Sequence, residues 1–204
     1  MTVTVSGSEF ILGGQRSGKS RRAESLARHW LDANPAHRAV MIATAQPWDA
    51  EMGERIARHQ QDRALRLPGM LTVEEPLDLG GAIARHSRAD TLVVVDCLTL
   101  WLTNLRMPLQ TATDDQQQAT ADMYAAAKQA EDSFLAAITS AVGPLVLVGN
   151  EIGLGVIPMG SQVRAFVDAL GRLNQDVAQR CQRVTLMAAG LPLTLKDTLK
   201  VTSP

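Results

Sequence analysis

The segment from Gly13 to Ser20, GGQRSGKS, fills every fixed position of the pattern G-x-x-x-x-G-K-[ST]. This pattern is typical of a loop that holds nucleotide phosphates, provided that a strand precedes it and a helix follows. Residues 10–12 are apolar and predict the end of a buried strand, and apolar residues at helical spacing predict a helix over 21–33. A glycine-rich turn that holds nothing is therefore the weaker interpretation. The sequence predicts a nucleotide-binding loop.

Each part of this loop has an expected role. Lys19 is expected to reach the β and γ phosphates, and Ser20 to give its hydroxyl to Mg²⁺. Arg16 and Arg21 are candidate phosphate clamps because a guanidinium pairs with phosphate in a fork, although either side chain can equally be a solvated charge at a helix end. The backbone around the phosphates is expected from Gly13, Gly14, Gln15, Arg16, Ser17 and Gly18.

Strand-like and helix-like segments alternate along the rest of the chain. Further strands are predicted at 39–43, 71–73, 91–96, 145–148 and 184–187, with the last of these closing the sheet, and further helices at 49–66, 77–86, 114–142 and 161–180. The polar residues 110–120 predict a solvated connection. Strands separated by helices imply a mostly parallel sheet. The expected fold is an α/β P-loop NTPase of the RecA-like kind, a three-layer α/β/α single domain over 1–204 with residues 1–8 as an N-terminal extension.

Composition excludes several classes of partner. The 204 residues include 20 Lys and Arg against 21 Asp and Glu, and only 3% aromatics, so neither a field that attracts nucleic acid nor base-stacking platforms are expected. No apolar run is long enough to insert into a membrane, and residues 1–8 do not resemble a signal peptide. Cys97 and Cys181 are isolated, which predicts reduced core thiols. We expect a cytoplasmic protein.

Two acidic residues follow predicted strands. Asp96 ends an apolar strand, where P-loop proteins keep the carboxylate that holds Mg²⁺ or its water. The alternative for Asp96 is to cap the helix that follows. Glu151 follows the strand at 145–148 and belongs either to the ligand crevice or to simple loop structure.

Several sequence blocks together resemble the bifunctional adenosylcobinamide kinase/adenosylcobinamide-phosphate guanylyltransferase family. After the GGQRSGKS loop these are IATAQ at 42–46, DAEMGERIARH at 49–59, TVEEP at 72–76, DCLTLWLTN at 96–104, NEIGLGVIP at 150–158 and GRLNQ at 171–175. Their order and spacing cover most of the chain from residue 10 to about residue 193.

The resemblance implies two reactions of cobalamin assembly at one nucleotide site. ATP or GTP phosphorylates adenosylcobinamide, and GMP from GTP then joins adenosylcobinamide phosphate, with release of pyrophosphate. The second step is expected to pass through a guanylyl-histidine, and the matching residue is His59. A lone histidine on a helix is usually packed or solvated, so only the surrounding block favours this role. His29, His37 and His86 lie outside the blocks and are expected at the surface.

The resemblance also assigns supporting roles. Thr44 and Ala45 match residues that line the nucleotide site, and Arg63 and Glu74 match guanine or ribose contacts. A carboxylate suits guanine, whose N1–H and N2–H₂ are adjacent donors. The chain is expected to form a homo-oligomer, for which a trimer is one candidate. It departs from the pattern at residues 64–71, where many relatives carry a tryptophan and this chain has ALRLPGML.

Three other functions have to be compared with this one. A regulatory GTPase would carry an N-K-x-D motif and, directly after the second strand, a D-x-x-G motif, and neither is found there. A RecA-like nucleic-acid motor would carry a basic stripe, which the balanced charge argues against. A monofunctional small-molecule kinase is the stronger rival, because it would need the P-loop and Asp96 but no reactive His59.

Overall fold

A seven-stranded sheet forms the centre of the structure, a computed structural model that describes residues 5, 7–107, 116–156 and 158–198. The strands lie in the order β3-β2-β4-β5-β1-β6-β7. The first six in the chain run parallel, and β7 pairs antiparallel with β6. Their bounds are β1 (Ser8–Gly13), β2 (Arg38–Ala43), β3 (Met70–Glu74), β4 (Thr91–Asp96), β5 (Leu145–Val148), β6 (Arg183–Ala188) and β7 (Leu191–Asp197).

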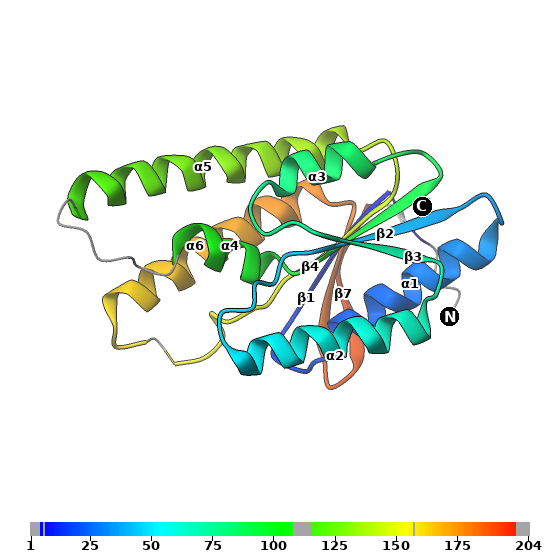
Figure 1. The fold of residues 1–204 in the computed structure, drawn as a ribbon, viewed down its shortest axis with the longest axis horizontal. Helices are drawn as coiled ribbons and strands as arrows, with labels where there is room; N and C mark the ends of the chain where they lie inside the picture. Colours follow the sequence, from blue (N-terminus) through cyan, green and yellow to red (C-terminus); the bar gives the residue numbers. More distant parts are fainter. Residues whose placement is uncertain (1–4, 6, 108–115, 157, 199–204) are drawn as a thin grey trace, which may run out of the picture.

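In the described part of the chain, six helices cover the two faces of this sheet. They are α1 (Lys19–Ala33), α2 (Ala50–Arg66), α3 (Leu79–His86), α4 (Leu98–Arg106), α5 (Gln116–Ser140) and α6 (Ser161–Arg180). In Figure 1, α1 and α2 lie on one side of the sheet and α3 to α6 on the other. Two buried clusters match these layers: α1 packs in one, and α3 to α6 supply the other. The fold is the expected three-layer α/β arrangement.

The apolar runs of the sequence form the strands covered on both faces. Residues 91–95 of β4 and all of β5 are buried, as strands between two helical layers must be. Trp101 of α4 packs at a tilt on Phe134 of α5, with ring centroids 4.9 Å apart, and both rings are fully buried. This contact fixes α4 and α5 to one face of the sheet. None of the described helices has the length and apolarity to cross a membrane.

One carboxylate inside the sheet fixes α1 in place. Glu9 of β1 is buried, and its Oε1 lies 2.7 Å from Nη2 of Arg22 on α1. The same oxygen accepts the hydroxyl of Thr185 on β6 at 2.8 Å. Nη1 of Arg183 lies 3.6 Å from the other oxygen, Oε2, so two arginines balance this buried charge, and loss of Arg22 would weaken that balance at a cost in stability. The start of α1, and with it the P-loop, is thereby held against β1 and β6.

The structure corrects three sequence predictions. The sheet does not close at β6, because the alternating segment 191–197 adds the edge strand β7, whose Pro192 is tolerated at an edge where no ladder N–H is needed. The segment after Asp96 forms the helix α4. Residues 116–120 belong both to the predicted connection 110–120 and to the predicted helix 114–142; they begin α5, so the helix prediction is confirmed for them, while 108–115 lie outside the described residues. The other predicted strands and helices are present with boundaries shifted by a few residues.

Two helical glycines provide a test of this packing. A Cβ on Gly171 of α6 would meet no atom within 4 Å, whereas a Cβ on Gly80 of α3 would lie 2.5 Å from Oγ of Ser133 and 2.9 Å from its backbone carbon. Gly171→Ala should raise the free energy of unfolding by about 0.5–1 kcal/mol through helix propensity. Gly80→Ala should lower it by about 1–3 kcal/mol through overpacking. Urea denaturation measures both, and equal effects would contradict the α3–α5 contact.

Candidate functional site

The predicted nucleotide-binding loop connects β1 to α1. Gly13 ends the strand in close contact with its neighbours, since a Cβ there would lie 2.5 Å from both the Met187 carbonyl oxygen and Oγ of Ser17. Gly18, just before α1, has φ of 100°, a conformation that favours glycine. The N–H of Gly190, in the turn between β6 and β7, donates to the Ser17 carbonyl at 3.0 Å. These contacts explain why the motif needs glycine at both ends.

Lys19 lies buried within the loop. Its Nζ donates to the carbonyl of Gly13 at 3.0 Å and to that of Gly14 at 2.6 Å. Burial lowers the pKa of Lys19 from its ordinary 10.5, while electrostatic interactions with Cys97 and Asp96 oppose the shift. The ammonium is thus held at the concave side of the loop, where bound phosphate would replace carbonyl oxygens as its partners.

Ser20 and Asp96 meet although β1 and β4 are not adjacent. The Ser20 hydroxyl donates to Oδ2 of Asp96 at 2.9 Å, across the end of the intervening strand β5. The capping alternative for Asp96 is wrong, because α4 has Cys97 at its N-cap and no side-chain cap. A hydroxyl and a carboxylate oxygen this close are hard ligands of the kind that Mg²⁺ prefers, and Mg²⁺ takes few ligands from protein when phosphates supply others. Among the described residues no group of three or more His, Cys, Asp or Glu is placed to hold a metal ion.

Thr44 sets the position of Asp96. Thr44 is fully buried at the end of β2, and its hydroxyl donates to the Cys97 carbonyl at 2.8 Å and accepts the Cys97 N–H at 2.9 Å. The Asn104 side chain of α4 in turn donates to the Thr44 carbonyl at 2.8 Å. The side chain of Thr44 is thus engaged by the backbone beside Asp96, while Ala45, next in the chain, is half-buried. Sequence reasoning did not single out Asn104, because an asparagine on a short helix carries no signal by itself.

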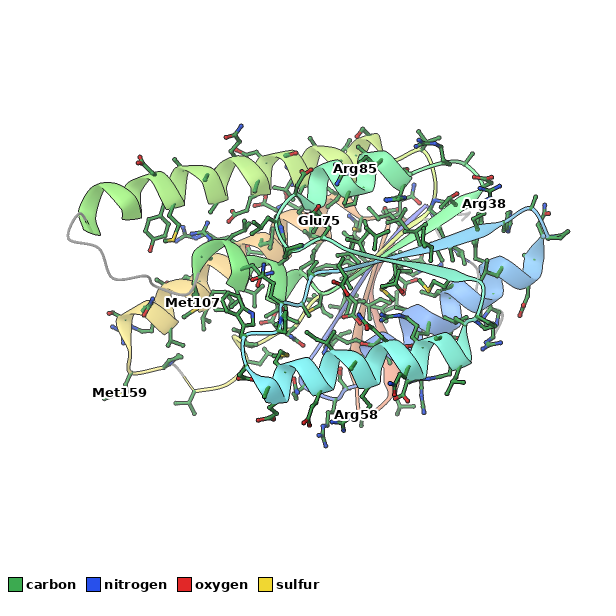
Figure 2. The ribbon with its side chains drawn as sticks, in the orientation of Figure 1. Arg38, Arg58, Glu75, Arg85, Met107 and Met159 are labelled. Carbon is green, nitrogen blue, oxygen red and sulfur yellow. The ribbon has the colours of Figure 1, made fainter. Side chains whose placement is uncertain are left out.

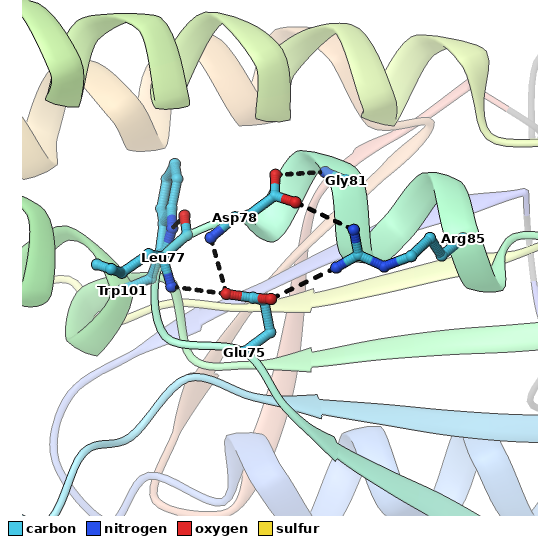
Figure 3. Close-up of polar contacts among 6 residues, drawn as sticks. All are labelled: Glu75, Leu77, Asp78, Gly81, Arg85 and Trp101. Carbon is cyan, nitrogen blue, oxygen red and sulfur yellow. Dashed lines mark hydrogen bonds and ion pairs between the residues drawn. The ribbon is translucent and has the colours of Figure 1, made fainter.

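The segment after β3 is held by a separate network. Figure 3 shows Glu75 accepting the N–H groups of Leu77 and Asp78, and Arg85 bridging the carboxylates of Glu75 and Asp78. Trp101 of α4 donates its indole N–H to the Leu77 carbonyl at 2.8 Å. This network fixes the chain immediately after Glu74.

The residues carried by α2 and β3 lie on the α1 side of the sheet. The C-terminal end of α2 is tied to α1 through Arg66, whose Nη1 lies 2.8 Å from Oε2 of Glu24. Arg63 is only 8% exposed, and its Nε has no hydrogen-bond partner among the described residues. Glu74 is exposed and accepts the Gln60 amide at 2.8 Å. His59 belongs to α2 by its backbone, and its side chain lies outside the described part of the structure.

In residues 64–71, which lack an aromatic side chain, Leu67 supplies the buried apolar contact. It is 3% exposed and packs in the core cluster that includes Ala23, Leu26 and Ala27 of α1. The apolar contact that anchors the end of α2 to α1 is therefore made by a leucine here.

The other histidines differ in exposure. His29 is exposed, and one of its ring nitrogens lies 2.6 Å from the carbonyl oxygen of Ser25. His37 is half-buried, because its ring stacks on Trp30 with centroids 3.7 Å apart. His86 is also half-buried. The surface prediction is therefore confirmed for His29, while His37 and His86 are only partly exposed.

One hollow borders the phosphate loop, and another lies beside α6. The first, of about 560 Å³, lies beside Arg16, Gly18 and Arg21 and is closed by the β6–β7 turn. The other, of about 590 Å³, lies between α6 and the segment that follows β5. That segment begins against the loop, since the N–H of Glu151 donates to the Gly13 carbonyl at 3.2 Å. The carboxylate of Glu151 accepts the Gly153 N–H at 3.0 Å, so it is engaged within its own turn.

The Thr44 contact gives a prediction. Thr44→Val keeps the shape but leaves the Cys97 N–H without its acceptor, and should lower the free energy of unfolding by about 1–3 kcal/mol. Because Asp96 loses its fixed neighbour, nucleotide binding should also require more Mg²⁺. Thr44→Ser, which keeps the hydroxyl, is the matched control. If valine and serine variants behave alike in urea denaturation and in Mg²⁺ titration of nucleotide binding, the positioning role of Thr44 is wrong.

Comparison with known proteins identifies the family of the chain. The family model for cobinamide kinase/cobinamide phosphate guanyltransferase matches residues 9–195. The bifunctional adenosylcobalamin biosynthesis protein CobP of Pseudomonas aeruginosa is 44% identical over 188 residues, covering 92% of this chain and 96% of that protein. Two proteins named CobU, from Salmonella typhimurium and Escherichia coli, are 33% and 32% identical, each over 92% of this chain and 98% of the relative.

Among solved structures, the flagellar accessory protein FlaH of Methanocaldococcus jannaschii aligns with 97% of this chain and 81% of its own, at 12% identity and a TM-score of 0.48. The family match spans nearly the whole chain and includes the P-loop, Thr44 and Asp96. The chain therefore belongs to the bifunctional cobinamide kinase/cobinamide phosphate guanylyltransferase family of cobalamin biosynthesis.

Proposed function

We propose that the chain carries out both reactions of its family at the single P-loop, with the Ser20–Asp96 pair as the observation that carries the proposal. In the first reaction the γ-phosphoryl of ATP or GTP passes to the hydroxyl of adenosylcobinamide. In the second, GMP from GTP joins adenosylcobinamide phosphate, giving adenosyl-GDP-cobinamide and pyrophosphate. A hydroxyl and a carboxylate 2.9 Å apart beside a buried lysine form the set that phosphoryl transfer requires.

The kinase step depends on positioning and charge. Lys19 neutralises charge on the β and γ oxygens, and the loop N–H groups orient the phosphate chain. Arg16 and Arg21, both exposed beside the loop, are available to clamp phosphate oxygens. When the acceptor hydroxyl attacks, its oxygen bonds to the γ-phosphorus, the bond to the β-phosphate oxygen breaks, and the nucleoside diphosphate leaves.

Mg²⁺ would be held by Ser20 and Asp96. When bound, the ion would offset the negative charge of the phosphate oxygens. The protein contributes the geometry: Thr44 holds the backbone next to Asp96, and α1 presents Ser20 at its first turn. Both oxygens therefore face the phosphate site before any ligand arrives.

The guanylyl step needs a nucleophile, which we assign to His59. A neutral imidazole nitrogen attacks the α-phosphorus of GTP, the bond to the β-phosphate oxygen breaks, and pyrophosphate leaves. A phosphate oxygen of adenosylcobinamide phosphate then displaces the imidazole and takes the GMP. Arg63 follows His59 by one helical turn, and its buried, unpartnered Nε supports a role in binding the guanylyl group. Glu74 is exposed on β3 and has the acceptor chemistry that guanine requires.

We also propose that the enzyme acts in the cytoplasm as a homo-oligomer, with a trimer as the first form to test. Leu191, Leu193 and Leu195 alternate along the edge strand β7 and are all exposed. An apolar row on a sheet edge is a surface on which a second copy can pack.

The metal assignment is tested by Asp96→Asn. The variant keeps the shape but loses the charge, so both reactions should need about tenfold more Mg²⁺, equivalent to about 1.4 kcal/mol. Asp90→Asn is the matched control, because Asp90 lies just before β4, at the opposite end of the strand from Asp96. An unchanged Mg²⁺ titration for Asp96→Asn would remove the carboxylate from the metal site.

His59→Ala separates the bifunctional enzyme from a monofunctional kinase. Wild-type protein incubated with α-labelled GTP should retain label after denaturation, lose it in acid and keep it in mild base, as a phosphoramidate does. His59→Ala should lose the label and guanylyl transfer but still phosphorylate adenosylcobinamide, because γ-transfer needs no protein nucleophile. His29→Ala, on the exposed side of α1, should label normally. Label that persists in His59→Ala would identify a different nucleophile.

A further inference from the structure

The loop between β5 and α6 exposes apolar side chains to an unusual degree. Leu154 is 81% exposed, and Val156 and Met159 are each 96% exposed. Figure 2 shows Met159 at the outer end of this loop, away from the body of the molecule. Single exposed apolar residues are ordinary, but several in one short segment that borders a hollow indicate a binding surface.

The hollow beside this loop has two unlike walls. The loop supplies Ile152, Val156 and Pro158, while α6 supplies Arg164, Asp168, Arg172 and Gln175. The α6 residues are spaced by four, four and three positions, so they share one face of the helix. Arg164 is engaged by the loop itself, donating to the carbonyl oxygens of Pro158 and Met159. The hollow thus pairs an apolar wall with a row of polar and charged groups.

The apolar wall of this hollow is joined to the phosphate loop through the backbone. Ile152, at one end of its apolar wall, follows Glu151, whose N–H donates to the Gly13 carbonyl of the P-loop at 3.2 Å. Asn174 of α6 donates to the Asn150 carbonyl at 3.1 Å and so fixes the start of the loop. The start of the apolar wall is therefore fixed next to the phosphate-binding loop.

We propose that this hollow, the β5–α6 groove, holds the corrin ring of the cobinamide substrate, an inference that rests on the proposed function. A corrin ring is flat, carries methyl groups that suit the apolar loop, and bears carboxamide arms that suit the α6 row. Its aminopropanol arm would extend past Glu151 to bring the hydroxyl to the γ-phosphate. In the second reaction, the phosphate on the same arm would meet the guanylyl group.

A second copy of the chain fits this groove less well. The centre of a protein interface is depleted of charged residues, whereas here the helical wall carries two arginines and an aspartate. A substrate with amide arms can satisfy those groups and still cover the apolar loop. The alternating leucines of β7 offer a different surface for self-association.

The test uses two variants that alter the groove in opposite ways. Val156→Ser removes an exposed apolar contact, and Gly171→Phe fills the groove, because nothing lies within 4 Å of the Gly171 Cβ. Each should raise the KM for adenosylcobinamide about tenfold or more, which corresponds to about 1.4 kcal/mol. The KM for nucleotide and the labelling of the protein by α-labelled GTP, in which no corrinoid takes part, should stay within about twofold. Val142→Ser, also exposed but outside the groove, and Gly171→Ala are the controls.

Two results would overturn the inference. One is an unchanged adenosylcobinamide KM in both groove variants. The other is a fall in molar mass by light scattering that accompanies the loss of activity, which would make the groove a contact between copies. If wild-type protein neither labels nor phosphorylates adenosylcobinamide, the proposed function fails instead, so the two failures are distinguishable.

Discussion

The hydrogen bond between Ser20 and Asp96 requires β1 and β4 to end at the same level with one strand between them. β5 occupies that place and pairs in register with both, so Val148 lies opposite Ile11 on one side and Asp96 on the other. The phosphate loop depends on the same arrangement, because the carbonyl of Gly13 accepts the N–H of Glu151 just beyond β5. The order of the strands thus brings the ends of β1 and β4 close together, and Ser20 and Asp96 supply the functional groups at that place.

Around this centre the structure assigns separate tasks to neighbouring elements. β2 and α4 act through Thr44 and Asn104 and hold the backbone beside Asp96. The β6–β7 turn holds the phosphate loop through the N–H of Gly190, which donates to the Ser17 carbonyl. The nucleophile that we propose lies on α2, whereas the groove that we propose for the corrinoid lies beside α6. One set of phosphates can therefore serve two transfers, with nucleotide and acceptor approaching from different elements.

Much of this could be predicted from sequence, since the P-loop pattern and the buried strands 91–96 and 145–148 specify local structure strongly. The family was confirmed, and so was the α/β fold with its mostly parallel sheet. β7 escaped prediction because its leucines point to the surface of an edge strand, where alternation does not imply burial. The role of Thr44 in holding the backbone beside Asp96 could not be predicted either, because its hydroxyl forms hydrogen bonds with the backbone of Cys97, which is distant in the chain. The role of His59 stays a prediction.

The order of the strands also affects how the chain acquires its activity during synthesis. β1 carries the phosphate loop and leaves the ribosome first, yet its partners β5 and β6 are made late: Ser8 pairs with Leu145, and Glu9 pairs with Arg183. Such distant pairings slow folding and leave early strands exposed. The loop cannot take its final shape until the β6–β7 turn has emerged to meet Ser17. The phosphate loop therefore gains its last backbone contact only after residue 190 has been made.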